Sequence, residues 1–336
     1  MVKADAYGCG GVEISRALNK WGVEDLGVAY TQEGVELRQN GIKGSIMVMN
    51  PLPQDFSELV HHHLEPEISN LQMLTKWVDF FRQEKLVDYP IHLEVDTGMK
   101  RLGFMEDDIG ELTDILRTTS AIKIKSLYSH LSSIPCPADD DFTLKQLDLF
   151  DEWSELLNAH INYPIDRHIL NSAGILRFPD HKYDMVRLGI GLYGVGLESH
   201  RAQKKLKPVQ FLYASISQVK EVKSGESIGY DRKGKLPVDG RIAILNIGYA
   251  DGLLRLAGNG RFSVRIGDKL CPVVGSVCMD MTMVDVSACP EAQPGMPVEI
   301  YGEHHPVIHL AEACETIPYE ILTANHQRLH RVLVDE

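Results

Sequence analysis

The sequence predicts an α/β fold followed by a mainly β domain, and three observations carry this prediction. Up to about residue 205, apolar runs that suit buried strands alternate with amphipathic stretches that suit helices. After Lys205–Pro208 the long helical stretches disappear, and short strand-like runs are punctuated by Gly, Asp and Pro. Repeated strand–helix units predict a parallel sheet, and their number in roughly 200 residues suits a (β/α)8 TIM-type barrel. We therefore predict a barrel over residues 1–207 and a mainly β domain over residues 208–336, although a doubly wound sheet fits the periodicity of the first part nearly as well.

The elements expected in the first part follow from two patterns. Apolar runs that suit buried parallel strands cover Val28–Tyr30, Ser45–Met49, Ile91–Val95, Ile124–Ser129 and Val186–Gly194. Stretches with apolar side chains at helical spacing cover Gly11–Trp21, Gln32–Gln39, Asn70–Arg82, Asp107–Arg117 and Phe142–Leu157. Strands and helices thus alternate along the chain.

The second part reads as short strands with one later helix. The strands are expected at Leu212–Val222, Arg241–Ile247, Phe262–Ile266, Val273–Val277, Thr282–Val286 and Val298–Tyr301. The helix is expected at Val307–Glu315. This change of pattern is the reason for predicting a separate domain.

Composition excludes several classes of protein. A chain of 336 residues can bury a sizeable core, and its net charge of −13 argues against a nucleic-acid partner, which needs a basic surface. No apolar run approaches the ~18 residues of a membrane span, and the first residues do not resemble a signal peptide. The six cysteines are scattered without a CxxC pair, which favours reduced thiols in a cytoplasmic enzyme.

Lys3 is the first candidate catalytic residue, because it lies where a buried strand ending in Met1–Val2 would leave the core. Gly8 and Gly10 permit sharp backbone turns after it. Desolvation and nearby cations lower the pKa of an amine in such a place, so that it can attack a carbonyl and form a Schiff base. An isolated Val-Lys pair more often marks a surface lysine, so the neighbouring motifs decide between the two interpretations.

Those motifs resemble the alanine racemase family over nearly the whole chain, in the family's order and spacing. The matching stretches are VKADAYGCG at 2–10, DTGMKRLGF at 96–104, SH at 129–130, NSA at 171–173, VRLGIGLYG at 186–194, IGYADG at 247–252 and CMD at 278–280. One such match is weak, whereas this many in register is strong. The resemblance also decides between the two folds, because it implies the barrel.

The resemblance implies that the protein binds pyridoxal 5'-phosphate. Lys3 is then the residue that holds the cofactor and one of two catalytic bases, and Arg187 faces the pyridine nitrogen while His168 orients Arg187. Because arginine keeps its proton, the ring nitrogen stays unprotonated and the cofactor becomes a weaker electron sink, which disfavours decarboxylation and transamination. The residues implied in cofactor binding are Lys3, Arg101, His168 and Arg187, with Tyr7, Ser172, Gly189 and Ile190 at the phosphate.

Racemisation needs a base on each face of the α-carbon. Lys3 serves one face, and Tyr230 matches the family tyrosine that reaches the other face from the neighbouring subunit, so the resemblance implies a homodimer with shared active sites. His130 matches the histidine that contacts this tyrosine. The residues implied in substrate binding are Arg101, the backbone N–H of Met279, and Tyr249 at the entrance; Asp280 and Arg255 follow on weaker grounds.

The sequence departs from the family in a few places. Glu94 stands seven residues before Arg101, where the family often has a lysine that becomes carbamylated, and we expect Glu94 to pair with Arg101 directly. Gln327 stands where some members have a tyrosine at the phosphate and substrate gate, which bears on the choice between alanine and serine. Family members also carry a few dozen residues before the lysine strand, so it stays open whether Met1 is a true start or an interior residue.

No metal site is expected. His61-His62-His63 cannot all face one ion from a regular element, and the run suits a solvated helix end. Asp139-Asp140-Asp141 suits an acidic loop or a helix start better than a magnesium site.

The leading hypothesis is a cytoplasmic racemase that interconverts L- and D-alanine and supplies D-alanine for peptidoglycan. A serine racemase or one of broader specificity remains open. A pyridoxal-phosphate decarboxylase of related architecture is disfavoured by Arg187, since those enzymes place a carboxylate at the ring nitrogen. A non-catalytic carrier built from a lone barrel is disfavoured by the β domain with Tyr230 and Tyr249.

Overall fold

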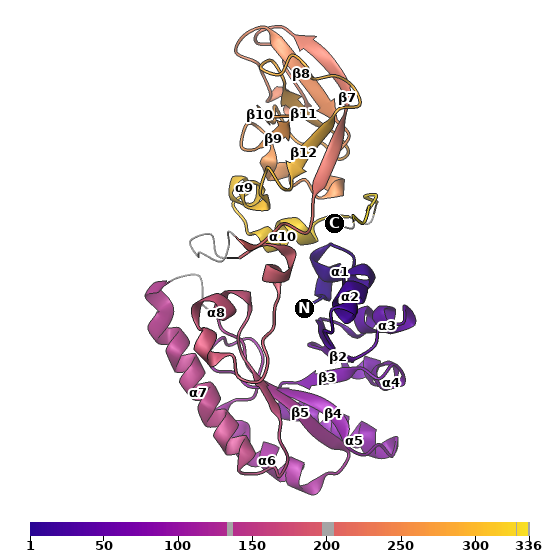
Figure 1. Cartoon of the computed structure of the whole chain (residues 1–336), viewed down its shortest axis with the longest axis vertical. Coiled ribbons are helices and arrows are strands. Elements are labelled where there is room, and N and C mark those ends of the chain that lie inside the picture. Colours follow the sequence, from indigo (N-terminus) through magenta and orange to yellow (C-terminus); the bar gives the residue numbers. More distant parts are fainter. Residues whose placement is uncertain (133–136, 197–204, 327, 335–336) are drawn as a thin grey trace. The chain divides into compact units, whose positions relative to one another are not determined.

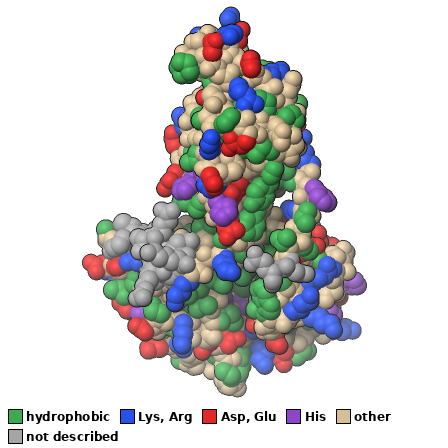
Figure 2. Space-filling model, turned by 45° about the horizontal axis from the view of Figure 1, so that its top comes forward, with side chains coloured by type: hydrophobic (Ala, Val, Ile, Leu, Met, Phe, Trp, Pro, Cys, Tyr) green, Lys and Arg blue, Asp and Glu red, His purple; other side chains and the backbone are tan. Residues whose placement is uncertain are grey.

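The computed structural model describes residues 1–132, 137–196, 205–326 and 328–334. The chain forms two compact units. The first consists of Met1–Ala6 and Gly10–Leu206, and the second of Tyr7–Cys9 and Lys207–Glu336. On the face shown in Figure 2, Lys and Arg side chains are interspersed with Asp and Glu, so this face has no continuous basic surface of the kind that binds nucleic acid.

The first unit is built on a curled parallel sheet whose strands follow one another in chain order. The strands are β1 (Asp25–Val28), β2 (Ser45–Val48), β3 (Glu65–Ile68), β4 (Tyr89–Glu94), β5 (Ile122–Tyr128) and β6 (Asp166–His168). The helices that connect them are α2 (Gly11–Lys20), α3 (Thr31–Gln39), α4 (Phe56–His61), α5 (Leu71–Gln83), α6 (Ile109–Thr118) and α7 (Asp140–Asn158), with α8 (Ser172–Arg177) after β6. Figure 1 shows the helices on the outer side of the strands, as strand–helix–strand connections require.

Backbone hydrogen bonds continue this sheet into a closed ring. The Val2 N–H donates to the Gly27 carbonyl oxygen of β1 (2.9 Å), and the Met1 nitrogen donates to the Leu188 carbonyl oxygen (2.9 Å). Next to Leu188, the Arg187 N–H donates to the Leu170 carbonyl oxygen just beyond β6 (3.0 Å). The extended segments at 1–2 and 184–188 therefore take the two positions between β6 and β1. The predicted barrel is confirmed.

Some predicted strands differ from those observed. Val186–Gly194 is extended only as far as Leu188, and then forms a 3-10 turn, Ile190–Tyr193, because Gly189 and Gly194 allow the chain to bend. Strands β3 and β6 were not predicted, because the sequences EPEI and DRH contain charged residues and a proline instead of an apolar run.

The second unit is an antiparallel sheet with the strand order β10-β9-β12-β7-β8-β11. Its strands are β7 (Leu212–Val222), β8 (Gly240–Leu245), β9 (Ser263–Ile266), β10 (Lys269–Pro272), β11 (Thr282–Asp285) and β12 (Pro297–Tyr301). The Val274 N–H donates to the Met283 carbonyl oxygen (2.8 Å), and Val273 pairs with Val284, so the two ends of the sheet meet. The predicted strand Val273–Val277 is reduced to this single bridge, because Gly275 turns the chain with a φ of 71°.

Two short helices follow the strands of the second unit, α9 (Val307–Ala313) and α10 (Pro318–Thr323). The core beside β8 and β11 is an apolar cluster of Ile228, Leu236, Ile242, Val274 and Met283. In the described part of the chain, every helix is too short or too polar to cross a membrane.

Candidate active site

Lys3 begins a left-handed turn, α1 (Lys3–Tyr7), at the end of the first extended segment of the barrel. Ala4, Asp5 and Ala6 have φ angles of 52°, 53° and 51°, and the Ala6 N–H donates to the Val2 carbonyl oxygen at 2.9 Å. A left-handed backbone costs about 1–2 kcal/mol for each residue that has a Cβ atom. Such strain persists only where surrounding contacts hold it, and it clusters at functional sites.

Two carboxylates hold this turn. The Glu33 carboxylate accepts from the Ala4 N–H at 2.6 Å and from the Ala29 N–H at 2.7 Å, which joins the turn to the loop after β1. The Asp5 carboxylate accepts from the Gly11 N–H at 2.6 Å, where α2 begins. Lys3 is thus placed by a hydrogen-bonded frame at the carboxyl end of the barrel strands.

The Lys3 amine is partly buried among charged groups. Burial and the positive charges of Arg101 and Arg187 lower its pKa, and the negative charges of Glu33 and Glu94 oppose this effect. A lowered pKa increases the neutral fraction of the amine, which is the form that acts as a nucleophile or accepts a proton.

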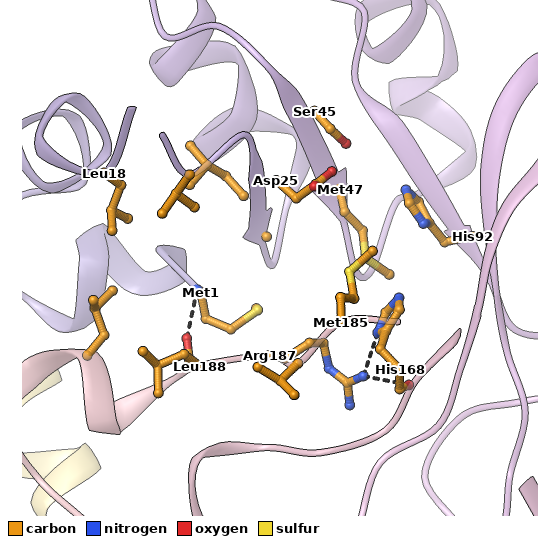
Figure 3. Close-up of a pocket in the computed structure, with 15 residues that line it drawn as sticks. Met1, Leu18, Asp25, Ser45, Met47, His92, His168, Met185, Arg187 and Leu188 are labelled. Atoms are coloured by element: carbon orange, nitrogen blue, oxygen red, sulfur yellow. Dashed lines mark hydrogen bonds between the residues drawn. The ribbon is translucent and has the colours of Figure 1, made fainter. Parts of the chain in front are cut away.

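Arg187 is 8% exposed and donates to acceptors on every side. One guanidinium nitrogen, Nη1, lies 2.7 Å from Nδ1 of His168 and 3.0 Å from the His168 carbonyl oxygen (Figure 3). The other, Nη2, donates to the carbonyl oxygens of Ser129 (2.6 Å) and Ile169 (3.3 Å) and lies 3.2 Å from Nδ1 of His130. A buried guanidinium with this many neutral acceptors keeps both its charge and its orientation.

The ring of Tyr128 supports both Arg187 and His168. The His168 ring stacks on it with centroids 5.1 Å apart and an interplanar angle of 3°, and the Arg187 guanidinium lies 5.0 Å from its centroid. Burial and the charge of Arg187 hold the pKa of His168 well below its ordinary value. His168 is therefore a neutral acceptor for Arg187.

His130 is also neutral, because burial and the charges of Arg187, Arg101 and Lys3 lower its pKa to about 3. Its backbone carbonyl oxygen accepts from the Gln146 side-chain amide of α7 at 3.2 Å. Because Nδ1 accepts from Arg187, the ring proton of His130 lies on Nε2, from which it can donate to a phenolate oxygen and so help a neighbouring tyrosine to lose its proton, as the sequence hypothesis asks.

Ser172 forms a small cradle with the glycine-rich turn at 189–191. Its Oγ accepts from the Gly189 N–H (2.9 Å) and from the Gly191 N–H (3.1 Å). A Cβ atom added to Gly191 would lie 3.4 Å from Ser172 Oγ, so glycine keeps this approach open. Between these two donors, the Ile190 N–H has no hydrogen-bond partner within the described ranges.

Arg101 lies in a tight excursion of the chain between β4 and α6. The Phe104 N–H donates to the Glu94 carbonyl oxygen (2.8 Å), and the Asp96 carboxylate accepts from the Gly98 N–H (2.8 Å). This closes the loop at its base and leaves the Arg101 side chain exposed. Arg101 nevertheless lies near enough to Lys3 and His130 to lower the pKa of both.

Glu94 does not form the expected ion pair with Arg101 in this structure. Its carboxyl group is 3% exposed and shares a hydrogen bond with Glu67, which is also 3% exposed. Burial and the neighbouring Glu94 raise the pKa of Glu67 well above its ordinary value, which favours the protonated form of Glu67 beside Glu94. The prediction failed because a sequence does not show that Glu67 on β3 lies beside Glu94 on β4.

Tyr7 belongs to the second compact unit. The centroid of its ring lies 6.0 Å from that of Tyr319 on α10. Burial and the neighbouring Tyr319 phenol raise the pKa of Tyr7 to about 12. Tyr319 was not among the predicted residues, because its position in IPYE marks only a helix start. Gln327, for which a departure from the family was predicted, lies outside the described residues.

Tyr230 is 67% exposed on a strained turn of the second unit. Asp231 and Arg232, which follow it, have φ angles of 57° and 54°, and the turn is closed by paired hydrogen bonds between Ile228 and Gly234 (2.8 and 3.1 Å). Because Ile228 belongs to the apolar cluster, the core holds the base of the turn while the phenol faces outward.

Tyr249 and Met279 lie on two loops that are joined to each other. The Tyr249 N–H donates to the Cys278 carbonyl oxygen (3.0 Å), and the Ala250 N–H donates to the Met279 carbonyl oxygen (3.0 Å). The Tyr249 and Met279 side chains are 43% and 53% exposed.

Arg328, which was not predicted, ties the same two loops together. It donates to Asp251 after Tyr249 (2.7 Å) and to Asp280 after Met279 (2.7 Å). The sequence does not indicate this contact, because Asp251 and Asp280 lie 77 and 48 residues before Arg328 in the chain.

The predicted residues thus fall into separate groups within the units. In the first unit Lys3, Arg101, His130, His168 and Arg187 form one cluster, with Ser172, Gly189 and Ile190 forming the cradle. In the second unit Tyr249 and Met279 lie together, with Tyr7 beside Tyr319 and Tyr230 on its own turn. Among the described residues, no group of three or more His, Cys, Asp or Glu side chains is placed to hold a metal ion.

Comparisons with known proteins agree over the whole chain. Residues 1–196 match the family "Alanine racemase, N-terminal domain", and residues 209–333 match "Alanine racemase, C-terminal domain". An alanine racemase of Treponema denticola is 34% identical, covering 100% of this chain and 90% of that protein. One of Clostridium kluyveri is 36% identical, covering 99% of this chain and 87% of that protein.

Solved structures give the same result. Alanine racemase from the D-cycloserine producer Streptomyces lavendulae superposes with a TM-score of 0.93 at 30% identity, covering 100% of this chain and 90% of that chain. Alanine racemase from Bartonella henselae, solved with covalently bound pyridoxal phosphate, has a TM-score of 0.89 at 28% identity, covering 99% of this chain and 91% of that chain.

Proposed function

The chain belongs to the alanine racemase family, and from this premise we propose that it interconverts L-alanine and D-alanine with pyridoxal phosphate by a two-base mechanism. The observation that carries the proposal is the cluster in the first unit. There a lysine with a lowered pKa lies among Arg101, Arg187 and His130, and Arg187 is fixed by His168.

The residues of this cluster fit pyridoxal phosphate. The Ser172 cradle offers two backbone N–H groups that converge on one oxygen, and a third, at Ile190, that has no partner among the described residues, which suits a phosphate group. Arg187 would face the ring nitrogen, and the Lys3 amine would hold the aldehyde carbon. The contact of Tyr7 with the phosphate rests on the family resemblance alone. When bound, the cofactor withdraws electrons from the substrate and so acidifies its α C–H bond.

Side chains of the protein then transfer the protons on the two faces of the α-carbon. The Lys3 amine, whose pKa is lowered, moves the proton on one face of the α-carbon. On the opposite face the proton is moved by Tyr230 of the partner subunit, whose exposed position on the second unit suits a residue that is donated to another chain. The neutral imidazole of His130 helps this phenol to release its proton. The enzyme is therefore a homodimer with shared active sites.

Arg101, Met279 and Tyr249 bind and admit the substrate in this scheme. The Arg101 guanidinium and the Met279 backbone N–H hold the substrate carboxylate, and the Tyr249 side chain lines the entrance. Arg187 would limit side reactions, because a guanidinium keeps its own protons and would leave the ring nitrogen unprotonated, which makes the cofactor a weaker electron sink. The substrate is alanine, the reaction takes place in the cytoplasm, and the product serves peptidoglycan synthesis.

A racemisation assay of the yellow holoenzyme across L-alanine, L-serine, L-lysine and L-arginine tests the proposal. We expect L-alanine to be the best substrate. Lys3→Ala should abolish both activity and the absorbance of the covalently held cofactor. Tyr230→Phe should retain the absorbance but slow the two directions unequally, because each base serves one face. Full activity of Tyr230→Phe in both directions would remove the two-base assignment.

A further inference from the structure

The interior of the barrel in the first unit is unusually polar. Such interiors are normally filled by bulky branched apolar side chains. Here four neighbouring strands bring Glu65 of β3, His92 of β4, Ser126 of β5 and His168 of β6 into mutual contact. His92, Ser126 and His168 are 3%, 0% and 1% exposed, so their polar atoms depend on one another for partners.

These side chains form a continuous row of hydrogen bonds that starts at Arg187. Nη1 of Arg187 lies 2.7 Å from His168 Nδ1, and His168 Nε2 lies 2.9 Å from Ser126 Oγ. Ser126 Oγ lies 2.6 Å from His92 Nδ1, and His92 Nε2 lies 3.0 Å from the Glu65 carboxylate. Figure 3 shows His168 and His92 on the same side of the cavity that Arg187 lines.

The chemistry of the first member sets the direction of every proton in the row. Arg187 has only donors, so His168 Nδ1 must be an acceptor and its proton must lie on Nε2. This proton is donated to Ser126 Oγ, and the single hydroxyl proton of Ser126 is then donated to His92 Nδ1. His92 must likewise carry its proton on Nε2, where it is donated to the carboxylate. The row is therefore consistent in one direction only, with Nδ1 of each imidazole accepting and Nε2 of each donating.

The far end of the row is an anion that is held in place. Although burial opposes ionisation, hydrogen bonds from His92 and Ser45 and the charge of Lys125 lower the pKa of Glu65 to about 2. Ser45 Oγ lies 2.5 Å and Lys125 Nζ 3.0 Å from the same carboxylate oxygen that accepts from His92. The row therefore ends at a carboxylate, which only accepts hydrogen bonds. The direction of donation along the row requires such a group at this end.

We propose that Glu65 is a positioning residue for Arg187. It acts across the barrel through His92, Ser126 and His168, and it keeps His168 as an acceptor so that the guanidinium stays fixed. The importance of that orientation for catalysis rests on the proposed function, whereas the order of the protons does not.

Ring-¹⁵N-histidine NMR of the holoenzyme tests the order of the protons directly. We expect His92 and His168 to give the shift pattern of neutral imidazoles protonated on Nε2, with the signals assigned by their loss in His92→Gln and His168→Gln. A charged imidazole at His92, or a proton on Nδ1 of either residue, would overturn the proposal. This readout is independent of racemase activity.

Glu65→Leu tests the role of the anchor. Leucine offers no acceptor to His92 Nε2, so the row loses the group that sets its far end, and a proton can move to His168 Nδ1 against the Arg187 donors. We expect the His168 signals to change tautomer, and kcat for alanine to fall about tenfold with little change in KM, the cost of about one hydrogen bond. Unchanged histidine signals in Glu65→Leu would contradict the anchor role.

Two further variants keep the test decisive. Ser45→Ala removes another hydrogen bond to the same carboxylate without touching the row, so its histidine tautomers and kcat should match those of the parent protein. If Glu65→Leu does not fold, Ser126→Ala interrupts the row at its centre and should release His168 from the single tautomer. A parent protein with the expected tautomers but no racemase activity would count against the proposed function and leave the row intact.

Discussion

The two units place their functional side chains in opposite ways. In the first unit the candidate groups are buried with their charges, as Arg187 and His168 are, and their pKa values are shifted by burial and by one another. In the second unit Tyr230, Tyr249 and Met279 lie exposed on loops above an apolar core. The first arrangement tunes proton affinity through desolvation, and the second presents side chains at its surface with little desolvation cost.

This difference predicts whether a substitution should change activity, stability or both. In the barrel, the candidate groups are buried and hydrogen-bonded within the core, so a change at the proposed site should also disturb folding. In the β unit, the exposed side chains and the core that holds their loops are different residues. Substitutions there should separate activity from stability.

The largest effect on stability is expected for Arg187→Met. Removing the guanidinium leaves the carbonyl oxygens of Ser129, His168 and Ile169 without that donor, and buried polar groups that lose a partner destabilise by about 3–5 kcal/mol in all. All three tryptophans, Trp21, Trp77 and Trp153, lie in the first unit, so tryptophan fluorescence during urea unfolding measures this unit. A loss below about 1 kcal/mol would show that the buried charge is not part of the barrel's stability.

The sequence predicted those parts of the site that stand at strand ends in local motifs. Lys3, His130, Ser172 and Arg187 were recognisable because each sits in a short stretch that can be compared with the family. Strand β3 was missed, because EPEI carries two carboxylates and a proline where an apolar run was sought.

The missed contacts lie between segments far apart in the chain. His92 and Ser126 are 34 residues apart, and His92 and Glu65 are 27 residues apart, so the closed barrel alone brings them together. Tyr319 likewise meets Tyr7 only through the fold. Periodicity gives each strand a face, but it does not tell which side chain meets which across neighbouring strands.

Acid should produce the next largest effect, and it should come mainly from the barrel. Burial and nearby cations lower the folded pKa of His130 to about 3, whereas the unfolded imidazole takes up a proton near pH 6.5. The unfolded state therefore binds more protons below pH 6.5. The stability that a neutral His130 contributes is present above that pH and is lost as the pH falls toward 3.

Between pH 6.5 and 4 this loss is on the order of 3 kcal/mol for His130. His168, whose pKa is also lowered, adds a loss in the same direction. Tryptophan fluorescence during urea unfolding at a series of pH values measures the slope, and His130→Asn should flatten it. An equally steep slope in His130→Asn would contradict the assignment. His305 in the second unit has a lowered pKa as well, so hydrogen exchange should record a smaller acid effect there.

Ile228→Ala should act on the second unit alone. Ile228 is 5% exposed in the apolar cluster, and truncating such a side chain costs about 2–4 kcal/mol. Hydrogen exchange of amides in β8 and β11 should speed up, while the tryptophan unfolding of the barrel stays unchanged. Because Ile228 closes the turn that carries Tyr230, activity should fall as well. Equal destabilisation of both units would show that they unfold together.

Tyr230→Phe should give the smallest change in stability. The side chain is 67% exposed, and removal of an exposed hydroxyl group shifts the free energy of unfolding by less than about 0.5 kcal/mol. The matched control is Tyr213→Phe on β7, which is 52% exposed and outside the proposed site. Both variants should match the parent protein in hydrogen exchange, and only Tyr230→Phe should alter racemisation. If Tyr230→Phe instead destabilised the β unit by as much as Ile228→Ala, the phenol would belong to the core of that unit, and the contrast between buried and presented groups would fail.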